Sequence, residues 1–400
     1  MGSSEAPVII SGAGPVGLIA AANLIRHGIP VVVLERSEDV PRDLRASTFH
    51  PPTLDMLAEF GIADRLVERG LVCRNWQYRD RDTGVVATFD MGVLSDDTAY
   101  PFRLQCEQWK MSDMLREDFA GTGGIDMRYG HSVTGFTQDE DGVTVLFTDP
   151  AGEPGEVRGR YLIAADGAHS PIRKQLGVKF DGQTIPEIFL SISTSFDFAA
   201  VIPDLAPIAY VSDPDEWQVL LRTPTLWRVL LPTDARLSDD EIKNPDTIER
   251  RLQAIQFNPD RYEILHCTAY RVHERVAEAY VHGRVFLAGD AAHLNNPLGG
   301  MGMNGGIHDA LNLTNRLVEV LAGAAPETLG RYERQRRKVA LDTVQATTLR
   351  NRKMMSEKDP AARAAYHDEL RGIVADRAKH RAHLLKASMI QSLRDLEAVA

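Results

Sequence analysis

Glycines recur in three short segments that lie far apart in the chain, and two of these segments also contain an aspartate. Residues 12–17 read Gly-Ala-Gly-Pro-Val-Gly, residues 165–170 read Ala-Asp-Gly-Ala-His-Ser, and residues 287–293 read Leu-Ala-Gly-Asp-Ala-Ala-His. Glycine-rich turns let backbone N–H groups reach phosphate oxygens, and carboxylates at strand ends accept hydrogen bonds from sugar hydroxyls. The three segments therefore predict a site for a dinucleotide.

The first segment has the full context of a phosphate-binding turn. It follows an apolar run at 8–10 and opens a helix at Pro15, whose fixed φ suits a first helical position. Gly12 permits the tight turn, and Gly14 permits the approach of a pyrophosphate. Gly17 lets the helix pack closely against the sheet.

A carboxylate closes the second apolar strand of this unit. Glu35 follows the run 31–34, and an acid at that position accepts hydrogen bonds from a ribose 2′-hydroxyl. Val16 and Arg36 are assigned to the same site. Because NAD and FAD both contain an adenosine ribose, this unit alone does not distinguish between them.

The other two segments each place a carboxylate at the end of an apolar strand. Asp166 follows the run 161–165, and Asp290 follows the run 285–288. Taken singly, either acid is typical of a cap or a turn. Taken together, and facing the crevice where α/β sheets bind ligands, they indicate a long polyhydroxylated ligand. The ribityl chain of FAD is such a ligand, and Asp290 is the better candidate to bond it.

A literal Gly-x-Gly-x-x-Gly match at 300–305 does not predict a second dinucleotide unit. The residues before it include Asn295, Asn296 and Pro297 and form no strand. We interpret the match as a loop that opens a helix, whose N–H groups face the pyrimidine edge of a flavin, where the reduced cofactor is negative. The residues assigned to this contact are Gly302, Met303 and Asn304.

The composition is that of an ordinary globular enzyme and argues against two classes of partner. With 44% hydrophobic and 25% charged residues, the 400-residue chain can form two or more domains. A net charge of −11 argues against nucleic acid, and no run approaches the roughly 20 apolar residues of a membrane helix. The three cysteines show no metal-ligand spacing, and the N-terminus shows no secretory signal. We therefore expect a cytoplasmic protein without a metal site.

Helices and strands must both be present to position these three segments. Apolar patterning predicts helices over residues 53–69, 108–119, 239–256 and 311–321, and over much of 329–396. Strand-like runs dominate 187–270, at 189–196, 208–211, 217–222 and 227–231, and the turn 82–84 predicts a hairpin within 71–89.

Up to about Arg337, the chain resembles the class A flavin-dependent aromatic hydroxylases of the para-hydroxybenzoate hydroxylase type. The pattern that carries the resemblance is Gly-Arg-Val-Phe-Leu-Ala-Gly-Asp-Ala-Ala-His at 283–293, followed by Pro297 and by Gly-Met-Asn at 302–304. In these enzymes an arginine contacts the flavin, and Arg45 matches it. A flavin-contacting glutamine is matched by Gln108, with Gln105 as its rival.

The resemblance implies an α/β + β fold in three parts. These are a Rossmann-like FAD-binding domain of the glutathione-reductase-like type, an inserted sheet-based substrate domain, and C-terminal helices. The FAD-binding domain is expected at 1–72, 100–180 and 272–325, the substrate-binding domain at 73–99 and 181–271, and the helical region at 326–400.

The resemblance also implies the chemistry and its partners. NADH or NADPH, bound without a domain of its own, reduces FAD, and O2 then adds at flavin C4a. One oxygen passes from the hydroperoxide to an electron-rich aromatic or heteroaromatic ring, and the site must exclude water, since otherwise H2O2 is released. The expected partners are a small aromatic substrate and O2, with no nucleic acid and no membrane, for a monomer or homodimer.

The substrate is expected between the flavin and the sheet of residues 187–270. The residues assigned to it are Tyr210, Arg222, Arg228 and Pro297. Either arginine could hold a substrate carboxylate, although both also fit exposed strand positions. The catalytic candidates are Pro297, His50 and His293, with His273 as a further histidine. His293 fits support of the loop better, and no residue is assigned as the base.

Other functions stay open at this point. The main alternative is an FAD-dependent reductase or epoxidase of the same superfamily that acts on a non-aromatic substrate. A flavin-dependent halogenase would carry Trp-x-Trp-x-Ile-Pro, which the segment 227–232 lacks. A non-enzymatic FAD-binding regulator would show no NAD(P)H turnover with any ring. The charged tail after Asp342 is interpreted as helical packing or a dimer contact.

Overall fold

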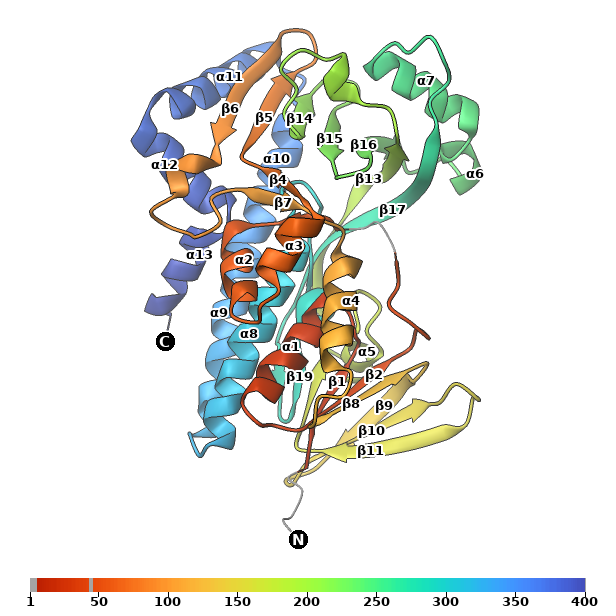
Figure 1. Ribbon diagram of the computed structural model, residues 1–400, viewed down its shortest axis with the longest axis vertical. Helices are drawn as coiled ribbons and strands as arrows, with labels where there is room; N and C mark the ends of the chain where they lie inside the picture. Colours follow the sequence, from red (N-terminus) through yellow and green to blue (C-terminus); the bar gives the residue numbers. More distant parts are fainter. Residues whose placement is uncertain (1–5, 43–45, 400) are drawn as a thin grey trace.

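The computed structural model describes residues 6–42 and 46–399. Within these ranges the chain folds around two large sheets, one in the lower half and one in the upper half of Figure 1. The lower sheet has six described strands, in the order β18 (Val281–His282), β19 (Val285–Leu287), β12 (Tyr161–Ala164), β1 (Val8–Ser11), β2 (Val31–Glu35) and β8 (Ile125–Tyr129). This is the nucleotide-binding sheet that the sequence predicts.

Parallel pairing explains why the strands of the lower sheet are uniformly apolar. β1 pairs in parallel with β2 and with β12, and the side chains of β1 and β12 are buried throughout. A sheet that is buried on both faces requires such continuous apolar runs. The helices of this lower half are α1 (Pro15–Arg26), α4 (Gln108–Phe119), α5 (Pro171–Gln175), α8 (Gly302–Leu321) and α9 (Leu329–Lys338).

The upper sheet is mixed and collects strands from distant parts of the chain. Its eight described strands run in the order β20 (His293–Leu294), β17 (Ile264–Ala277), β13 (Phe180–Thr194), β16 (Trp227–Asp234), β15 (Gln218–Arg222), β14 (Ile208–Ser212), β5 (Asn75–Asp80) and β6 (Gly84–Asp90). The predicted hairpin at the turn 82–84 is confirmed as β5 and β6. β13 begins nine residues before the predicted run 189–196, where its extra part pairs with β17.

Two small sheets complete the described β-structure. One contains β11 (Pro154–Gly159), β10 (Val143–Thr148) and β9 (Ser132–Gln138) at the bottom of Figure 1. The other contains β3 (Thr48–Phe49), β7 (Arg103–Gln105) and β4 (Leu71–Cys73), in the region where the two halves meet.

Two helices predicted as continuous are each divided by a residue that breaks a helix. The predicted helix 53–69 consists of α2 (Pro51–Ala58) and α3 (Ala63–Arg69), because Gly61 between them adopts a φ of +69°. The predicted helix 239–256 consists of α6 (Asp239–Ile242) and α7 (Pro245–Ile255). Pro245 has no N–H to continue a helix, and the side chain of Asn244 caps the new one.

The C-terminal helices cover the upper sheet of their own chain. After α9 the chain forms a π-helix at Val339–Gln345 and then α10 (Ala346–Met355). It continues through α11 (Pro360–Ala375), α12 (Arg377–Ala387) and α13 (Ile390–Asp395), and of these α11 and α12 lie beside β6 and the turn that follows it in Figure 1. The predicted helical packing of the tail is therefore found within one chain.

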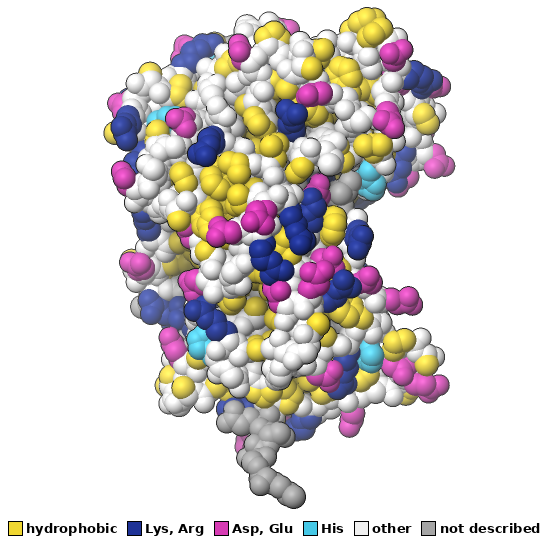
Figure 2. All heavy atoms as spheres, in the orientation of Figure 1, with side chains coloured by type: hydrophobic (Ala, Val, Ile, Leu, Met, Phe, Trp, Pro, Cys, Tyr) yellow, Lys and Arg dark blue, Asp and Glu magenta, His cyan; other side chains and the backbone are white. Residues whose placement is uncertain are grey.

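The surface mixes charges of both signs. On the face shown in Figure 2, Lys and Arg side chains lie among Asp and Glu side chains. The molecule is hollowed on the right-hand side of this view, between the part that carries α6 and α7 and the part that carries β9, β10 and β11. Among the described helices, none combines the length and apolar character needed to cross a membrane.

Candidate functional site

The three glycine-containing segments meet at the ends of neighbouring strands. A Cβ atom on Gly12 would lie 2.4 Å from the backbone oxygen of Ala165, and Gly12 has a φ of +103°. A Cβ atom on Gly289 would lie 2.9 Å from the side chain of Val16. The second and third segments therefore both touch the first, and the structure brings together what the sequence separates by more than 270 residues.

Gly17 and Gly14 have opposite surroundings. A Cβ atom on Gly17 would lie 1.9 Å from the backbone oxygen of Gly12, so the start of α1 packs against the turn as predicted. A Cβ atom on Gly14 would meet no heavy atom of the described residues within 4 Å. The space in front of Gly14 is thus open beside the N-terminus of α1, where a pyrophosphate is expected.

Glu35 is held beside this turn by backbone donors. Its carboxylate accepts one hydrogen bond of 2.8 Å from the N–H of Ala13 and another of 2.8 Å from the N–H of Ser37. This arrangement fixes the carboxylate at the end of β2, where a ribose is expected. Arg36 is exposed, and Arg45 lies outside the described residues.

Asp166 provides a direct test of whether a polar ligand belongs here. Both of its carboxylate oxygens are buried, and neither has a hydrogen-bond partner among residues 6–42 and 46–399. Burial raises the pKa of Asp166 to about 6. A buried carboxylate without donors is costly, so this position fits a site completed by the hydroxyl or N–H groups of a bound ligand.

Asp290 lies in a short turn that a buried ionic network supports. The side chain of Asp290 is exposed at the turn Gly289–Ala291. Behind the turn, Asp309 accepts a hydrogen bond of 3.0 Å from the N–H of Gly289 and contacts His293 at 2.7 Å. Arg336 donates to the other oxygen of Asp309 at 2.6 Å. His293 therefore supports the loop, as the sequence favours.

The start of α8 presents backbone donors next to the same crevice. α8 begins at Gly302, and the first N–H groups of a helix have no partner within the helix. The side chain of Asn304 is used inside the protein: it donates to Thr48 and Gly300 carbonyls at 2.9 and 2.7 Å and accepts from His50 N–H at 2.9 Å. Only the backbone of Asn304 is left for the predicted flavin contact.

His50 is buried within this packing and is not exposed to a substrate. Its Nε2 lies 2.8 Å from the carbonyl oxygen of Gly299. Burial, and then the charge of Arg103, lower the pKa of His50 to about 3. His50 is therefore neutral at ordinary pH and fixes the start of α2. His273 lies on β17, where Thr184 contacts its Nδ1 at 3.0 Å.

Both candidate glutamines lie against the segment that follows Arg45. Gln105 is buried, accepts a bond of 2.9 Å from Ser47 and donates one of 2.8 Å to Thr48. Gln108 begins α4, and its N–H donates to the carbonyl of Ala46 at 3.0 Å. The side chain of Gln105 is thus used in contacts within the protein, and Gln108 stays the predicted flavin contact.

These residues fit FAD. The open turn at Gly14, the unpartnered carboxylate of Asp166 and the free helix N-terminus at Gly302 supply sites for phosphate, hydroxyl and pyrimidine groups. A turn that binds no ligand would not account for the buried, unpartnered carboxylate of Asp166.

A cavity of about 250 Å³ lies between the upper sheet and the C-terminal helices. The sheet contributes aromatic side chains to it, among them Trp76, Tyr78, Phe89 and Tyr210. The loop before α8 contributes Gly299 and Met301, strand β7 contributes Arg103, and helices α10, α11 and α12 contribute the remaining wall. An aromatic-walled cavity of this size suits a small planar ring.

Arg103 is the polar group of this cavity that most clearly lacks a partner. Its side chain is 2% exposed, and its Nε and Nη1 atoms have no hydrogen-bond acceptor within the described parts of the chain. The guanidinium lies 4.8 Å from the ring centroid of Trp76. A buried cation with unused donors favours an anionic or strongly polar ligand atom.

A column of stacked rings continues from Arg103. Trp76 stacks on Phe89 with centroids 4.1 Å apart, and Phe89 stacks on His383 of α12 at 4.8 Å. Burial, and then the charge of Arg350, lower the pKa of His383 to about 4. His383 is therefore a neutral imidazole in the cavity wall.

The predicted substrate residues are only partly found at this cavity. Tyr210 lines it. Arg222 is 41% exposed and pairs with Asp197 at 3.5 Å, and Arg228 is buried and donates to Ser47 at 3.2 Å, so neither belongs to the cavity wall. Pro297 does not line the cavity but lies in the turn that leads to it, where its carbonyl oxygen accepts a hydrogen bond from the N–H of Gly300.

The sequence does not predict that the C-terminal helices contribute residues to the cavity. It predicts helical packing or a dimer contact for the tail, whereas the tail residues Arg350, Tyr366, His383 and Lys386 line the cavity. Aromatic and basic residues at helical spacing are typical of any packed helix, so only the fold shows their orientation.

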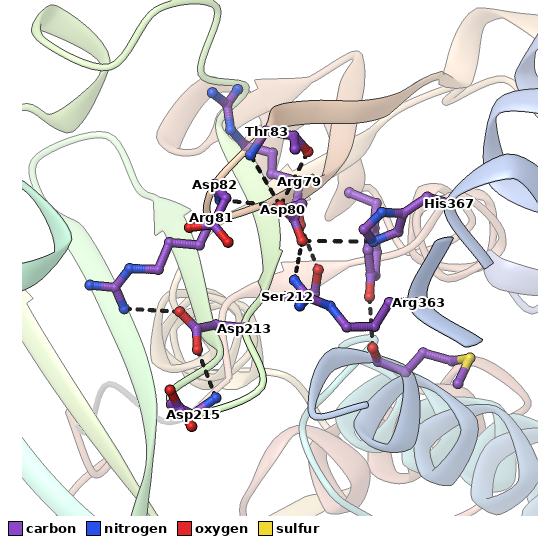
Figure 3. Close-up of polar contacts among 12 residues, drawn as sticks. Arg79, Asp80, Arg81, Asp82, Thr83, Ser212, Asp213, Asp215, Arg363 and His367 are labelled. Atoms are coloured by element: carbon purple, nitrogen blue, oxygen red, sulfur yellow. Dashed lines mark hydrogen bonds and ion pairs between the residues drawn. The ribbon is translucent and has the colours of Figure 1, made fainter. Parts of the chain in front are cut away.

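Buried ion pairs hold these helices on the sheet. Figure 3 shows Arg363 and His367 of α11 pointing toward Asp80 at the end of β5. Asp80 also accepts hydrogen bonds from Thr83. The side chain of Asp97, in the turn after β6, is 2% exposed and contacts Arg381 and Arg394, whose side chains are 43% and 45% exposed.

Comparisons with known proteins agree with this geometry. Residues 5–347 match the family described as FAD binding domain. The para-nitrophenol 4-monooxygenase of Pseudomonas sp. (strain WBC-3) is 36% identical over 395 residues, which cover 98% of this chain and 97% of that protein. The 6-hydroxy-3-succinoylpyridine 3-monooxygenase of Pseudomonas putida is 32% identical over 363 residues, 90% of this chain and 91% of that protein.

Solved structures give the same result. The crystal structure of p-nitrophenol 4-monooxygenase from Pseudomonas putida DLL-E4 superposes with a TM-score of 0.91 at 34% identity, over 98% of this chain and 99% of that chain. A ternary complex of aklavinone-11 hydroxylase with FAD and aklavinone gives 0.77 at 27% identity, over 90% and 70%. The resemblance is thereby confirmed, and the reductase or epoxidase alternative is not supported. The chain belongs to the FAD binding domain family and is an FAD-dependent aromatic monooxygenase of the class A flavin hydroxylase group.

Proposed function

We propose that this enzyme hydroxylates a small, single-ring phenol in the cavity beside Arg103, with O2 and with NADH or NADPH as the reductant. The observation that carries the proposal is the buried guanidinium of Arg103, whose Nε and Nη1 lack acceptors among the described residues. A phenolate oxygen or a nitro group on the ring supplies such an acceptor. NADH and NADPH are cytoplasmic reductants, so we place the reaction in the cytoplasm.

The residues divide into two groups with separate tasks. Gly14, Glu35, Asp166 and Asp290, with the N-terminus of α8, hold FAD, which when bound supplies the reducing and oxygen-activating chemistry. The cavity residues bind and orient the ring. We assign the first group to an FAD-binding unit of residues 1–72, 100–180 and 272–325. We assign the ring-binding unit to residues 73–99 and 181–271, and we add helices α10 to α12 because they line the cavity.

The cavity favours one ring over several fused rings. Relatives of this chain act on para-nitrophenol and on larger molecules such as rifampicin, according to their names. Here His383 and Ala387 of α12 close one side, and a volume of about 250 Å³ lies below the range of drug-sized sites. We infer that a nitrophenol or a similarly acidic phenol fits best.

Arg103 and His383 offer complementary contacts to the ring. Arg103 stabilises negative charge on the ring oxygen, which makes the ring more electron-rich. Because His383 is neutral, its imidazole can accept a hydrogen bond from a ring hydroxyl. Arg350 and Lys386 lie at the exposed rim, where their positive charge attracts anions.

The test compares two arginines. Arg103→Met should raise the dissociation constant of para-nitrophenol by about 10- to 100-fold, the effect of one lost charge-assisted hydrogen bond. Arg222→Met, outside the cavity, should leave it unchanged, and both variants should keep their FAD. Binding is measured by titration of flavin absorbance, and turnover by hydroxylated product from a panel of phenols, hydroxypyridines and fused-ring phenols. Weakened binding in Arg222→Met alone, or a preference for fused rings, would contradict the proposal.

A further inference from the structure

A fully buried carboxylate on β17 holds the loop that precedes α8. Glu274 is 0% exposed, and its Oε1 accepts hydrogen bonds from the backbone N–H of Asn296, at 3.1 Å, and from the side-chain amide of the same residue. The side-chain oxygen of Asn296 accepts a bond of 3.0 Å from the N–H of Leu298. Through one oxygen atom, Glu274 thus determines the path of residues 296–298.

The same oxygen also binds helix α10. The hydroxyl of Thr348 donates to Oε1 of Glu274 at 3.1 Å. One helical turn later, the amide of Asn351 donates to the carbonyl of Leu298 at 3.1 Å. Strand β17, the loop and α10 are therefore joined at a single buried point, reinforced by a second bond.

The parts joined in this way face the ring on one side and the cofactor on the other. Gly299 and Met301 of the loop line the cavity, and so do Thr347, Arg350 and Asn351 of α10. The loop continues directly into Gly302 and the N-terminus of α8, which we assign to the flavin. Neither Glu274 nor Thr348 lines the cavity itself.

We propose that Glu274 is a positioning residue, which fixes the cavity at the correct distance and angle from the flavin through Asn296 and Thr348. The inference rests on the proposed function for the identity of the ring and for the place of FAD. Transfer of oxygen requires the reacting carbon within near-contact distance, and a misplacement of about 1 Å can cost about 100-fold in rate. A displaced ring would still bind, but the two electrons and two protons that reduce O2 would then leave as H2O2 instead of being used to hydroxylate the ring.

Only Oε1 of Glu274 accepts these hydrogen bonds, so replacing the carboxylate by the amide of glutamine should have little effect. Oε2 of Glu274 has no hydrogen-bond partner among the residues that the structure describes. Burial raises the pKa of Glu274. Glu274→Gln keeps the accepting oxygen, so it should behave like the wild-type enzyme, whereas Glu274→Leu removes it.

Two matched pairs of variants test the proposal: Glu274→Gln against Glu274→Leu, and Thr348→Ser against Thr348→Val. The Thr348 pair decides the result if Glu274→Leu fails to fold. In Thr348→Val, the dissociation constants of FAD and para-nitrophenol should stay within about twofold of wild type. H2O2 released per NAD(P)H consumed should rise about threefold or more, and the ring-induced change in the flavin spectrum should fall by about half, as expected for one lost hydrogen bond. Thr348→Ser should match wild type in both.

The outcomes separate this inference from the function on which it rests. If no phenol perturbs the wild-type flavin spectrum, the proposed substrate class is wrong. If a phenol does so, and Thr348→Val shows the same perturbation and the same peroxide yield as Thr348→Ser, the positioning role is overturned. Equal loss of FAD in Thr348→Val and Thr348→Ser would also overturn it, because the effect would then not depend on the hydroxyl that bonds Glu274.

Discussion

At the scale of single residues, two aspartates at the ends of neighbouring strands have different properties because one is buried and the other is exposed. Asp166 is buried, its carboxylate lacks donors among the described residues, and burial raises its pKa to about 6. Asp290 is exposed at the turn above Asp309. The carboxylate of Asp166 is therefore the one of the two that changes its charge near pH 6.

Asp290→Ala should weaken FAD binding. The reason is the loss of one charge-assisted hydrogen bond to the ribityl chain, worth about 1.5–3 kcal/mol. The measurement is the FAD dissociation constant by fluorescence titration of the apoprotein. Glu278→Ala, an exposed change on the loop between β17 and β18, is the control, and an unchanged constant in Asp290→Ala would remove Asp290 from the site.

FAD affinity should rise with pH up to about 6 and then level off. Asp166 is protonated below its raised pKa of about 6 and must lose that proton to accept hydrogen bonds from the cofactor. Binding is therefore favoured as the pH increases through that value. Asp166→Asn should bind FAD with no such dependence between pH 5 and about pH 7. The same slope in both proteins would show that another group titrates.

At the scale of elements, the helices that close the cavity depend on buried pairs. The side chain of Asp80 is 4% exposed, and it contacts Arg363 and His367 of α11. Burial alone would raise its pKa, but hydrogen bonds from Thr83 and Arg363 outweigh burial and hold the pKa below the ordinary value. A carboxylate with a depressed pKa contributes stability above its unfolded-state pKa and loses it as the pH falls through the folded-state pKa.

Asp80→Asn should loosen α11 and flatten the acid dependence of stability. Removing one partner of a buried pair costs about 3 kcal/mol. Limited proteolysis should cleave the loop 356–359 of the variant faster than that of the wild type at neutral pH. The difference in free energy of unfolding between the two proteins should begin to shrink below about pH 4, where the Asp80 carboxyl of the unfolded chain becomes protonated, and should be lost as the pH falls through the lower pKa of the folded protein. A constant difference down to pH 2 would contradict this assignment.

The elements also show why the sequence indicates the candidate FAD site more directly than the cavity. The FAD residues follow apolar strands directly, so spacing within 8–35, 161–166 and 285–290 indicates their place. The bounds of α4, Gln108–Phe119, were predicted correctly because Met111, Met114 and Leu115 share one buried face. Cavity residues such as Arg103 and His383 come from β7 and α12, and their proximity depends on tertiary packing that no local pattern encodes.

At the scale of the whole molecule, the described residues contain one nucleotide-binding turn, which we assign to FAD. With NADH or NADPH as the proposed reductant, the nicotinamide would then meet the flavin transiently. A ring in the cavity can promote this meeting only through a difference in its affinity for the two arrangements.

The hydroxylated ring should therefore speed reduction of the flavin by NADH or NADPH. Anaerobic stopped-flow measurements with and without each ring give the rates. Rings that bind without being hydroxylated should yield mostly H2O2 under air. If every ring that is hydroxylated leaves the rate unchanged, the reductant meets the flavin by a route that the cavity does not influence.

The interleaving of the two sheets has a consequence for how the protein is made. The nucleotide sheet is complete only when β19 has been synthesised, at Leu287, whereas the cavity needs His383 and Lys386. At a synthesis rate of about 5–20 residues per second, roughly 100 residues separate these events by about 5–20 seconds. All strands of the nucleotide sheet are thus synthesised several seconds before the helical residues that close the cavity.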